Sequence, residues 1–334
     1  MRVDQVSVQL PPEDIERRKA WTRDTISPEG WLIPLPVACV AELDTVAATV
    51  RAIPRAIETL RPQDFSLRAC ADVMAAVRAK LETDTGLAVV DRFPVERYQD
   101  DQNRAIGWLL AAMLGQVVAQ KANGARLYDV KDTGQTLGYG VRRSVTNLGQ
   151  PFHTDGGWLW KAPAFVGLFC LESAREGGLS RFVSLVTAHN ELRRRRPDLL
   201  ERLYRPFCWD RQGEHVPDDV RVSSRPVYEY EGGTLASRYY EDYIVNGHKL
   251  AGTELDAEGR EALEAMRGIV DDPANWVEFR IEKGQLQYLN NRQFAHSRTA
   301  FKDADTPESG KGRHMLRLWN RDEGSSDLEG HPAA

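Results

Sequence analysis

A histidine and a carboxylate separated by one residue are the pair in this sequence best suited to chemistry. They are His153 and Asp155, in residues 150–157. In a β-strand, positions i and i+2 face the same side, so we expect both side chains to point into one interior. Both are good metal ligands, but two ligands do not close a metal site. The pair therefore predicts a third ligand elsewhere in the chain.

His296 is the best candidate for that third ligand among the seven histidines. It follows a strand-like run, residues 285–291, and its neighbours are small, aromatic or hydrogen-bonding, as at the rim of a pocket. Two imidazoles and one carboxylate on one face are the ligand set of non-haem iron(II) oxygenases, which leaves coordination positions open. An isolated H-x-D also occurs in surface turns, and at this point that alternative stays open.

A second group of residues lies near the C-terminus, where residues 313–319 read as a strand. Arg313 and Arg317 would then share one face. Two arginines on an inward face are costly without an anionic partner. A dicarboxylate such as 2-oxoglutarate would supply that partner, because the guanidinium group binds carboxylates in a bidentate manner. An exposed strand face with paired surface charges is the alternative.

Taken together and in this order, these motifs resemble the Fe(II)/2-oxoglutarate-dependent dioxygenases of the TauD/TfdA family, which are related to clavaminate synthase. The resemblance covers about residues 127–321. Its pieces are H-T-D-G at 153–156, G-G-L-S at 177–180, the block 284–301 with H-S-R-T at 296–299, and residues 313–317.

The resemblance implies a role for each of six residues. Arg313 would form the main salt bridge to the distal carboxylate of 2-oxoglutarate, and Arg317 would lie close to the co-substrate or to the substrate. The implied ligands of iron(II) are His153, Asp155 and His296, and the implied contacts of 2-oxoglutarate are Ser180, Arg313 and Arg317.

The activity that the resemblance implies is oxidation of an unactivated C–H bond, with consumption of O2 and release of succinate and CO2. Asp155 stands where related halogenases have a small residue. Hydroxylation, desaturation or cyclisation is therefore expected rather than halogenation. A jelly-roll protein that binds a metal or ligand without catalysis is the alternative.

The substrate is expected to be a small amino acid or another small carboxylate, as in secondary metabolism. Either Arg142 or Arg143 is a candidate for binding a substrate carboxylate, although surface arginines are equally common. The candidate pocket residues are Tyr139, Arg142, Arg143, Ser144, Asn147, Trp158, Arg238 and Tyr239.

The order of helical and strand-like segments predicts a mixed α/β fold with a mainly β core. The resemblance makes this a double-stranded β-helix, or jelly roll, with flanking helices. We expect one domain over residues 1–334: a helical part (1–126), the core (127–321) and a frayed polar tail (322–334). Helices are expected at 41–60, 65–81, 105–120, 187–205 and after Asp256. Strand-like runs are 86–90, 127–130, 139–145, 165–171, 179–185, 227–243, 276–281, 285–291 and 313–319. Residues 302–312 resemble a loop insertion.

Composition excludes several other classes of protein. With 44 Lys+Arg against 49 Asp+Glu, the net charge of −5 gives no basic field for nucleic acid. No apolar run reaches the length of a membrane span. Four scattered cysteines without C-x-x-C fit a reducing cytoplasm, and no signal peptide is visible. G-x-G-x-x-G, Walker A, G-x-S-x-G and H-E-x-x-H motifs are absent. A homo-oligomer is compatible with the sequence.

Overall fold

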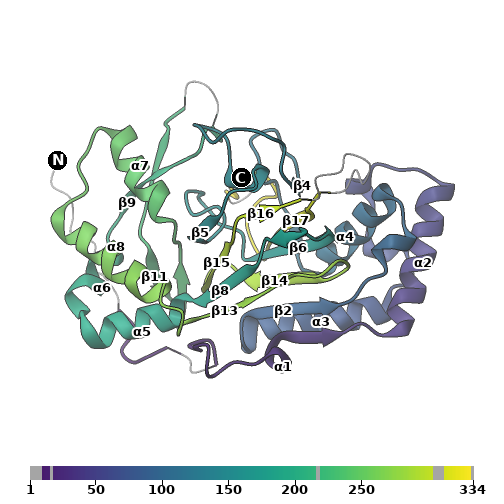
Figure 1. Ribbon diagram of the computed structural model, residues 1–334, viewed down its shortest axis with the longest axis horizontal. Helices are drawn as coiled ribbons and strands as arrows, with labels where there is room; N and C mark the ends of the chain where they lie inside the picture. Colours follow the sequence, from purple (N-terminus) through teal and green to yellow (C-terminus); the bar gives the residue numbers. More distant parts are fainter. Residues whose placement is uncertain (1–9, 16–17, 216–218, 304–311, 332–334) are drawn as a thin grey trace.

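Two β-sheets form the centre of the molecule, and helices pack around them (Figure 1). The computed structural model describes residues 10–15, 18–215, 219–303 and 312–331. Within these ranges the helices are α1 (Pro28–Trp31), α2 (Val37–Ala52), η1 (Ile57–Thr59), η2 (Pro62–Asp64), α3 (Arg68–Thr83), η3 (Val95–Arg97), α4 (Asp100–Leu114), η4 (Arg143–Val145), α5 (Leu185–Arg195), α6 (Pro197–Leu203), α7 (Glu241–Ala251) and α8 (Ala257–Val270), where η marks a 3-10 helix. The strands are β1 (Leu32–Pro34), β2 (Leu87–Asp91), β3 (Gln116–Val117), β4 (Leu127–Val130), β5 (Gln150–His153), β6 (Phe165–Glu172), β7 (Glu176–Gly177), β8 (Ser180–Ser184), β9 (Phe207–Asp210), β10 (Val222–Arg225), β11 (Tyr228–Glu231), β12 (Thr234–Ser237), β13 (Trp276–Phe279), β14 (Leu286–Asn290), β15 (Phe294–Arg298), β16 (Phe301–Lys302) and β17 (His314–Arg321).

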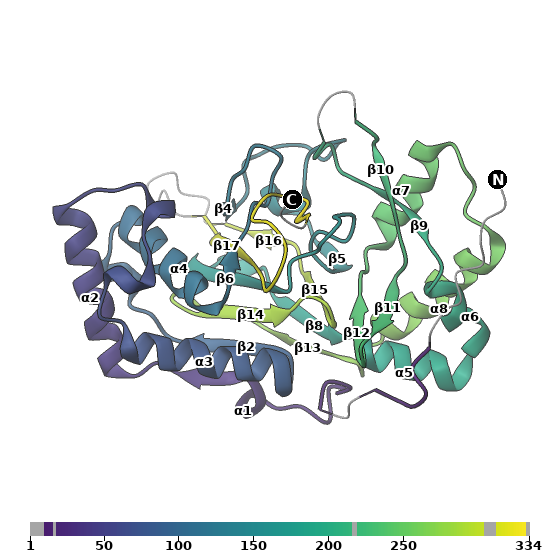
Figure 2. The same ribbon diagram turned by 180° about the vertical axis from the view of Figure 1, so that it is seen from behind.

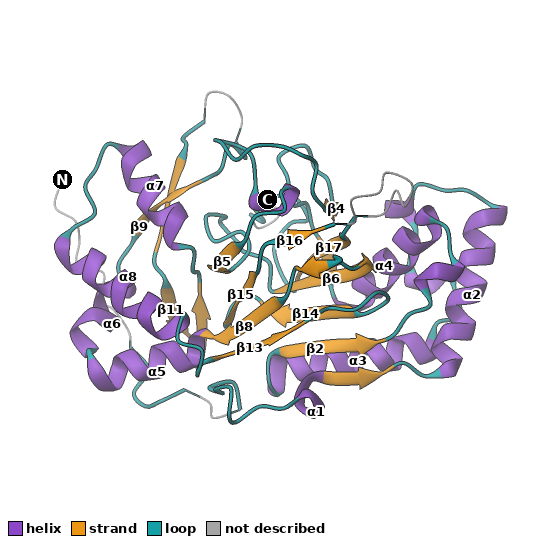
Figure 3. Ribbon diagram, in the orientation of Figure 1, coloured by secondary structure: helices purple, strands orange, loops and turns teal. Residues whose placement is uncertain are grey.

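The two main sheets have the pairing of a jelly roll. The larger has the order β1-β2-β14-β6-β17-β3, with β4 paired to β17, and it is antiparallel except between β1 and β2. The smaller, β13-β8-β15-β5, is antiparallel throughout. Strands occupy the middle of the molecule and helices lie at both ends (Figure 3). The predicted fold class, a mainly β jelly-roll core with flanking helices, is confirmed.

Side-chain alternation on the central strand β6 separates two hydrophobic cores. Val166 faces the smaller sheet and packs in one core with Phe182 of β8 and Leu289 of β14. Phe169 faces the helices and packs in the other core with Leu109 of α4. The first core joins the two sheets around the site described below, and the second attaches α2, α3 and α4 to the outer face of the larger sheet.

The helices of the first third form with shifted ends. α2 ends at Ala52, two residues before Pro54, because proline cannot donate the helical hydrogen bond and clashes with the preceding turn. α4 ends at Leu114 rather than near residue 120, and Gly115 follows it. The residues beyond this glycine leave the helix and pair with β17 as β3.

Of the segments expected as strands, one is not a strand and another is a strand only in part. Residues 139–142 form a turn that leads into η4, and Gly140 within it has a φ of +80°, which ends regular strand geometry. Part of residues 227–243 forms the hairpin β11–β12, but α7 begins at Glu241. Glu241 and Asp242 lie in its first turn, where carboxylates stabilise the helix dipole. Seen from behind, α7 lies beside the β9–β10 ribbon (Figure 2).

The C-terminal segment packs on the core where a frayed tail was expected. The guanidinium group of Arg321 donates to the carbonyl oxygens of Ser325, Asp327 and Leu328. Leu328 is buried, and Ala119 donates its N–H to the carbonyl of Ser326. Most of the predicted insertion at 302–312, namely residues 304–311, lies outside the described residues. No helix in the described part of the chain has the length and apolarity to cross a bilayer.

Candidate active site

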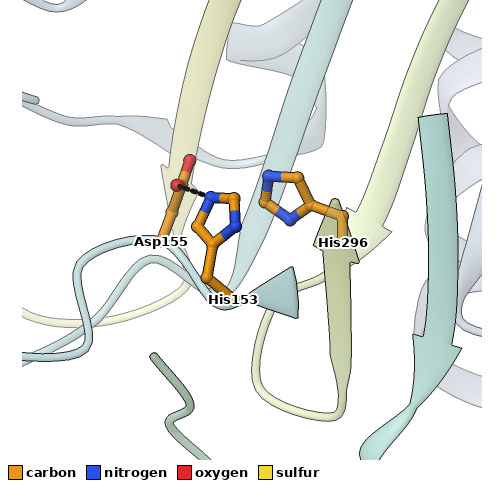
Figure 4. A group of neighbouring side chains, drawn as sticks. All are labelled: His153, Asp155 and His296. Carbon is orange, nitrogen blue, oxygen red and sulfur yellow. Dashed lines mark ion pairs between the residues drawn. The ribbon is translucent and has the colours of Figure 1, made fainter. Parts of the chain in front are cut away.

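His153, Asp155 and His296 lie together at the paired strands β5 and β15 of the smaller sheet (Figure 4). His153 ends β5, and His296 is its antiparallel partner on β15. The centroids of the two rings are 4.3 Å apart. One ligand atom from each of the three residues lies within 4.8 Å of the others, which is close enough for all three to reach one metal ion. Segments 140 residues apart therefore meet through a single strand pair.

Asp155 reaches this position from a turn, and the strand expected through residue 155 ends at His153. Asn291 fixes the turn: it accepts the N–H of Asp155 at 2.8 Å and donates to its carbonyl oxygen at 2.9 Å. The next residue, Gly156, has a φ of +66°, and an added Cβ would lie 2.7 Å from Leu159 Cδ1. The glycine is thus required both by the backbone conformation and by the close packing.

Hydrogen bonds orient one ligand atom on each of the first two residues; that of His153, Nε2, accepts from the Gln150 amide in this structure. His153 Nδ1 lies 2.9 Å from the carbonyl oxygen of Pro151, so it carries the proton and leaves a lone pair on Nε2. Asp155 Oδ2 accepts from Arg317 Nη1 at 3.1 Å and from Trp319 Nε1 at 2.8 Å. The other carboxylate oxygen, Oδ1, lies 3.4 Å from His153 Nε2 and faces the site.

The protonation states suit a divalent cation. Burial raises the pKa of Asp155, but the nearby Arg317 and the neighbouring His153 outweigh burial and hold it well below its usual range. Burial and the neighbouring His153 lower the pKa of His296 to about 3, so its imidazole is neutral. Its buried Nδ1 has no hydrogen-bond partner in the structure. A neutral imidazole with an unpaired nitrogen beside an ionised carboxylate fits iron(II).

A buried cation lies at the other end of the same interior. Arg313, which immediately precedes β17, is 2% exposed, and its Nη1 has no hydrogen-bond partner. No carboxylate of the described residues pairs with its guanidinium group; Asp303 accepts only its backbone N–H. Burial lowers the pKa of Arg313 to about 10. Ser180, also buried, begins β8 on the inner face of the smaller sheet.

Arg317 occupies a different place from Arg313, although both face inward as expected. Its Nε donates to Gln120 Oε1 at 2.7 Å, and its Nη1 binds Asp155. The guanidinium group lies over the rings of Tyr128 and Trp319. Arg317 is therefore committed to the metal-ligand carboxylate, whereas Arg313 is free to take an anion.

A small cavity opens beside the triad, and four of the predicted pocket residues line it. These are Arg142, Arg143, Ser144 and Trp158. Arg142 lies 2.9 Å from a carboxylate oxygen of Glu214, so its charge is already paired. Arg143 lies 3.7 Å from the half-exposed Asp242 and donates to the carbonyl of Gly149. Arg143 is therefore the more available cation.

The other four predicted pocket residues lie outside this cavity. Tyr139 is 54% exposed and its hydroxyl contacts His215, and Asn147 is also exposed. Arg238 binds the carbonyl oxygens of Gly157 and Leu159. Tyr239 pairs through its backbone with Thr154 and lines a separate hollow. Arg238 and Tyr239 therefore hold the turn that carries Asp155 through contacts with its backbone and with Thr154.

Three more residues line the cavity. Tyr240 is a further candidate from the sequence, beside Arg238 and Tyr239, and its ring lies 5.0 Å from that of His153. Gln150, which donates to His153 Nε2 at 2.8 Å, and Tyr243, which stacks on Tyr240 at 3.9 Å, were not found from the sequence. Tyr243 falls in a segment expected to continue as a strand, so only its aromatic type and its closeness to other pocket candidates could have indicated it.

A family profile described as "Taurine catabolism dioxygenase TauD, TfdA family" matches residues 49–319. This match spans most of the chain and includes the triad, Ser180, Arg313 and Arg317. The chain belongs to the TauD/TfdA family. The predicted family, the enzyme class of 2-oxoglutarate-dependent dioxygenase, and the iron(II) and 2-oxoglutarate requirement are confirmed.

Curated relatives of this TauD/TfdA protein resemble it over most of its length. FR-33289 synthase of Streptomyces rubellomurinus (strain ATCC 31215) is 26% identical over 93% of this chain and 91% of that protein. Taurine hydroxylase-like protein SAT17 of Stachybotrys chartarum (strain CBS 109288 / IBT 7711) is 25% identical over 88% and 76%. A uridine-5'-phosphate dioxygenase of an Amycolatopsis species is 26% identical over 53% and 66%.

Solved structures share the fold. Asparagine oxygenase with Fe(II), 2S,3S-3-hydroxyasparagine and succinate superposes with a TM-score of 0.64 at 18% identity, covering 89% of this chain and 94% of that one. The non-heme iron oxygenase OrfP with Fe and alpha-ketoglutaric acid gives 0.63 at 14% identity, covering 91% and 100%. Their low identity makes this likeness one of fold alone.

Proposed function

We propose that this dioxygenase binds iron(II) through His153, Asp155 and His296 and oxidises an unactivated C–H bond of a small amino acid or carboxylate. The observation that carries the proposal is the presence, beside this triad, of Arg313, a buried arginine with no acidic partner among the described residues. Metal ligands and a carboxylate-binding cation in one interior are what a chelating 2-oxo dicarboxylate needs.

The protein's own residues orient and shield the reacting groups. When bound, the iron would supply O2 activation and the oxidative decarboxylation of 2-oxoglutarate to succinate and CO2. Arg317 and Trp319 hold one oxygen of Asp155 and so aim the other at the site. Trp158, Tyr240 and Tyr243 wall the cavity with aromatic rings, which limits the entry of water.

The distal carboxylate of 2-oxoglutarate would bind Arg313 and Ser180. The guanidinium group offers an unpaired buried N–H, and burying an unpaired cation costs several kcal/mol, so an anion is strongly favoured there. Arg317 would remain beside the metal, near the chelating end of the co-substrate or the substrate.

A substrate anion would bind Arg143, because the charge of Arg142 is neutralised by Glu214. Two structural neighbours contain hydroxylated asparagine or arginine, and one relative is named for uridine 5'-phosphate. These molecules share an anionic group. Hydroxylation is the first expectation, with desaturation or cyclisation as further outcomes. Asp155 fills the position that a halide would need.

Anaerobic titration of metal-free protein with iron(II) and then 2-oxoglutarate tests the metal and co-substrate assignment. Chelation of the metal by the 2-oxo acid should produce a weak visible charge-transfer band that saturates with one equivalent of each. If no band appears at saturating reagents, the triad does not bind the chelate, and the proposed site is wrong.

Screening amino acids and small organic acids for O2-dependent succinate release tests the substrate class. A true substrate should stimulate succinate formation and yield one oxidised product per succinate. A charge-transfer band without stimulated turnover by any candidate would instead favour the non-catalytic binding protein. The homo-oligomer and the cytoplasmic location stay predictions from the sequence.

A further inference from the structure

Arg298 is a second buried arginine on the inner face of the smaller sheet. It lies on β15 two residues after His296, so both side chains face the same interior. Its cross-strand partner on β8 is Ser180, and such partners have Cβ atoms about 5 Å apart. Arg298 is only 8% exposed. It therefore lies directly beside the serine assigned above to the co-substrate.

Two buried guanidinium groups meet at one aromatic ring. The Cζ of Arg298 lies 4.8 Å and that of Arg313 lies 5.4 Å from the ring centroid of Phe301. Among the described residues, no carboxylate lies within ion-pair distance of either group. A cation–π contact recovers less free energy than burying a cation costs. Two buried cations without acidic partners at the same ring strongly favour the binding of an anion between them.

Each arginine retains a donor for that anion. Among the described residues, the Nε of Arg298 and the Nη1 of Arg313 are buried N–H groups with no hydrogen-bond partner. A carboxylate has two oxygens that accept about four hydrogen bonds, so it can use donors from both arginines and from a serine hydroxyl. These donors match the hydrogen-bonding capacity of one carboxylate.

Arg298 also holds the loop that lines the substrate cavity. Its Nη2 donates to the carbonyl oxygen of Thr146 at 3.0 Å and to that of Leu148. These residues follow η4, which carries Arg143 and Ser144. The guanidinium group of Arg298 therefore contacts the loop through Nη2 and leaves Nε for the carboxylate.

We propose that Arg298 is a second cationic contact for the distal carboxylate of 2-oxoglutarate and, through Thr146 and Leu148, positions the loop 143–149 for substrate. This rests on the proposed function, which places that carboxylate at Ser180 and Arg313. Binding of the carboxylate fixes the side chain, and the fixed side chain orders the loop. By reciprocity, co-substrate and substrate then strengthen each other's binding.

The carboxylate contact is tested with two ligands that differ only at the distal end. Binding of 2-oxoglutarate and of 2-oxopentanoate, which lacks the distal carboxylate, is measured by anaerobic calorimetry on Mn(II)-loaded protein. In Arg298→Gln we expect 2-oxoglutarate to bind ~10- to 100-fold more weakly and 2-oxopentanoate to bind as before. Arg181→Gln is the matched control, because Arg181 lies next to Ser180 on the opposite face and pairs with Glu278. It should leave both affinities unchanged.

The positioning role is tested by hydrogen exchange in residues 143–149. In the native protein 2-oxoglutarate should slow exchange there, and in Arg298→Gln it should not. Arg298→Lys keeps the charge but lacks the planar fork, so it should recover part of the affinity without protecting the loop. This variant also serves if Arg298→Gln does not fold.

Three outcomes decide the matter. An unchanged preference for 2-oxoglutarate over 2-oxopentanoate in the folded Arg298 variants overturns the carboxylate contact. Loop protection that persists in Arg298→Lys overturns the positioning role. If the native protein itself shows no such preference, the co-substrate site under the proposed function is wrong, and this inference fails with it.

Discussion

Single residues in this site divide their atoms between two tasks. Asp155 gives Oδ2 to Arg317 and Trp319 and turns Oδ1 toward the two histidines. Arg313 immediately precedes β17 and Arg317 lies within it, about 13 Å further along the strand. This spacing separates Arg317, which binds the carboxylate of Asp155, from Arg313, whose guanidinium group lies near Phe301.

Replacing Arg313 with Leu should weaken 2-oxoglutarate binding ~100-fold or more, because it removes the cation that the structure leaves without an acidic partner. The anaerobic charge-transfer titration measures this directly. Iron(II) affinity without co-substrate should stay the same, since Arg313 does not contact the triad. Unchanged 2-oxoglutarate affinity would transfer the role to Arg317.

Replacing Trp319 with Phe should lower metal affinity ~10- to 100-fold, because it removes the indole N–H that holds Asp155 Oδ2 while keeping most of the ring's packing. Calorimetric titration of the apo protein with Fe(II) or Co(II) gives the comparison. Trp108→Phe is the control. Trp108 lies on α4, and its replacement also removes a buried indole hydrogen bond, the one to the carbonyl oxygen of Leu60, without touching the triad. Equal losses in both variants would show a general packing effect instead.

The sequence predicted the candidate metal ligands and the buried arginines, because charged and metal-binding residue types are rare inside a core. His153 and His296 also lie on strands, as their sequence context indicated. The sequence could not predict the residues that orient these side chains. Asn290 and Asn291 are adjacent and identical in type, yet Asn290 binds the carbonyl of Leu81 and only Asn291 fixes the Asp155 turn. That difference depends on which way each side chain faces in the folded protein.

At the level of elements, patterns of buried residues were predicted better than boundaries. The runs at 165–171 and 285–291 form β6 and β14, whose apolar continuity fits strands buried on both faces. The strand expected at 139–145 failed because its glycine-rich start forms a turn. The helix expected at 187–205 forms as two helices, α5 and α6, and seven residues of α5, including His189, are buried.

His189 makes folding stability depend on pH. Its Nε2 lies 2.9 Å from the hydroxyl of Tyr204, and burial lowers its pKa to about 4. The unfolded chain takes up this proton near pH 6.5 and the folded chain only near pH 4. Between these values the unfolded state binds more protons. The contribution of His189 to the free energy of unfolding is therefore fully present above pH 6.5 and falls by about 3 kcal/mol as the pH drops to 4.

His189→Gln should reduce this slope by the share of His189, because glutamine does not titrate; His296, whose pKa is lowered to about 3, contributes equally in both proteins. Urea unfolding of the metal-free protein at intervals from pH 4.5 to 7 measures the free energy of unfolding for both proteins. His331→Gln changes an exposed histidine near the C-terminus and should leave the slope unchanged. The interpretation fails if His189→Gln keeps the native slope.

For the whole molecule, the helical first third and the jelly roll are joined through one sheet. β1, β2 and β3 come from residues 32–117, yet β2 pairs with β14 and β3 pairs with β17. The outer core mixes side chains of α2, α3 and α4 with those of β6, β14 and β17. Two independent domains would each keep their own core, so this arrangement favours the single domain predicted over residues 1–334.

This shared sheet predicts that the chain unfolds as one cooperative unit. Calorimetry of the metal-free protein should show one transition whose calorimetric and van't Hoff enthalpies agree. A fragment of residues 127–334 should not fold, because it would expose the outer core and leave the edge of β14 unpaired. Its circular dichroism should lack native β signal, whereas the full chain purified in the same way should show it. Two separate transitions, or a folded fragment that binds metal, would mean that residues 1–126 form a domain of their own.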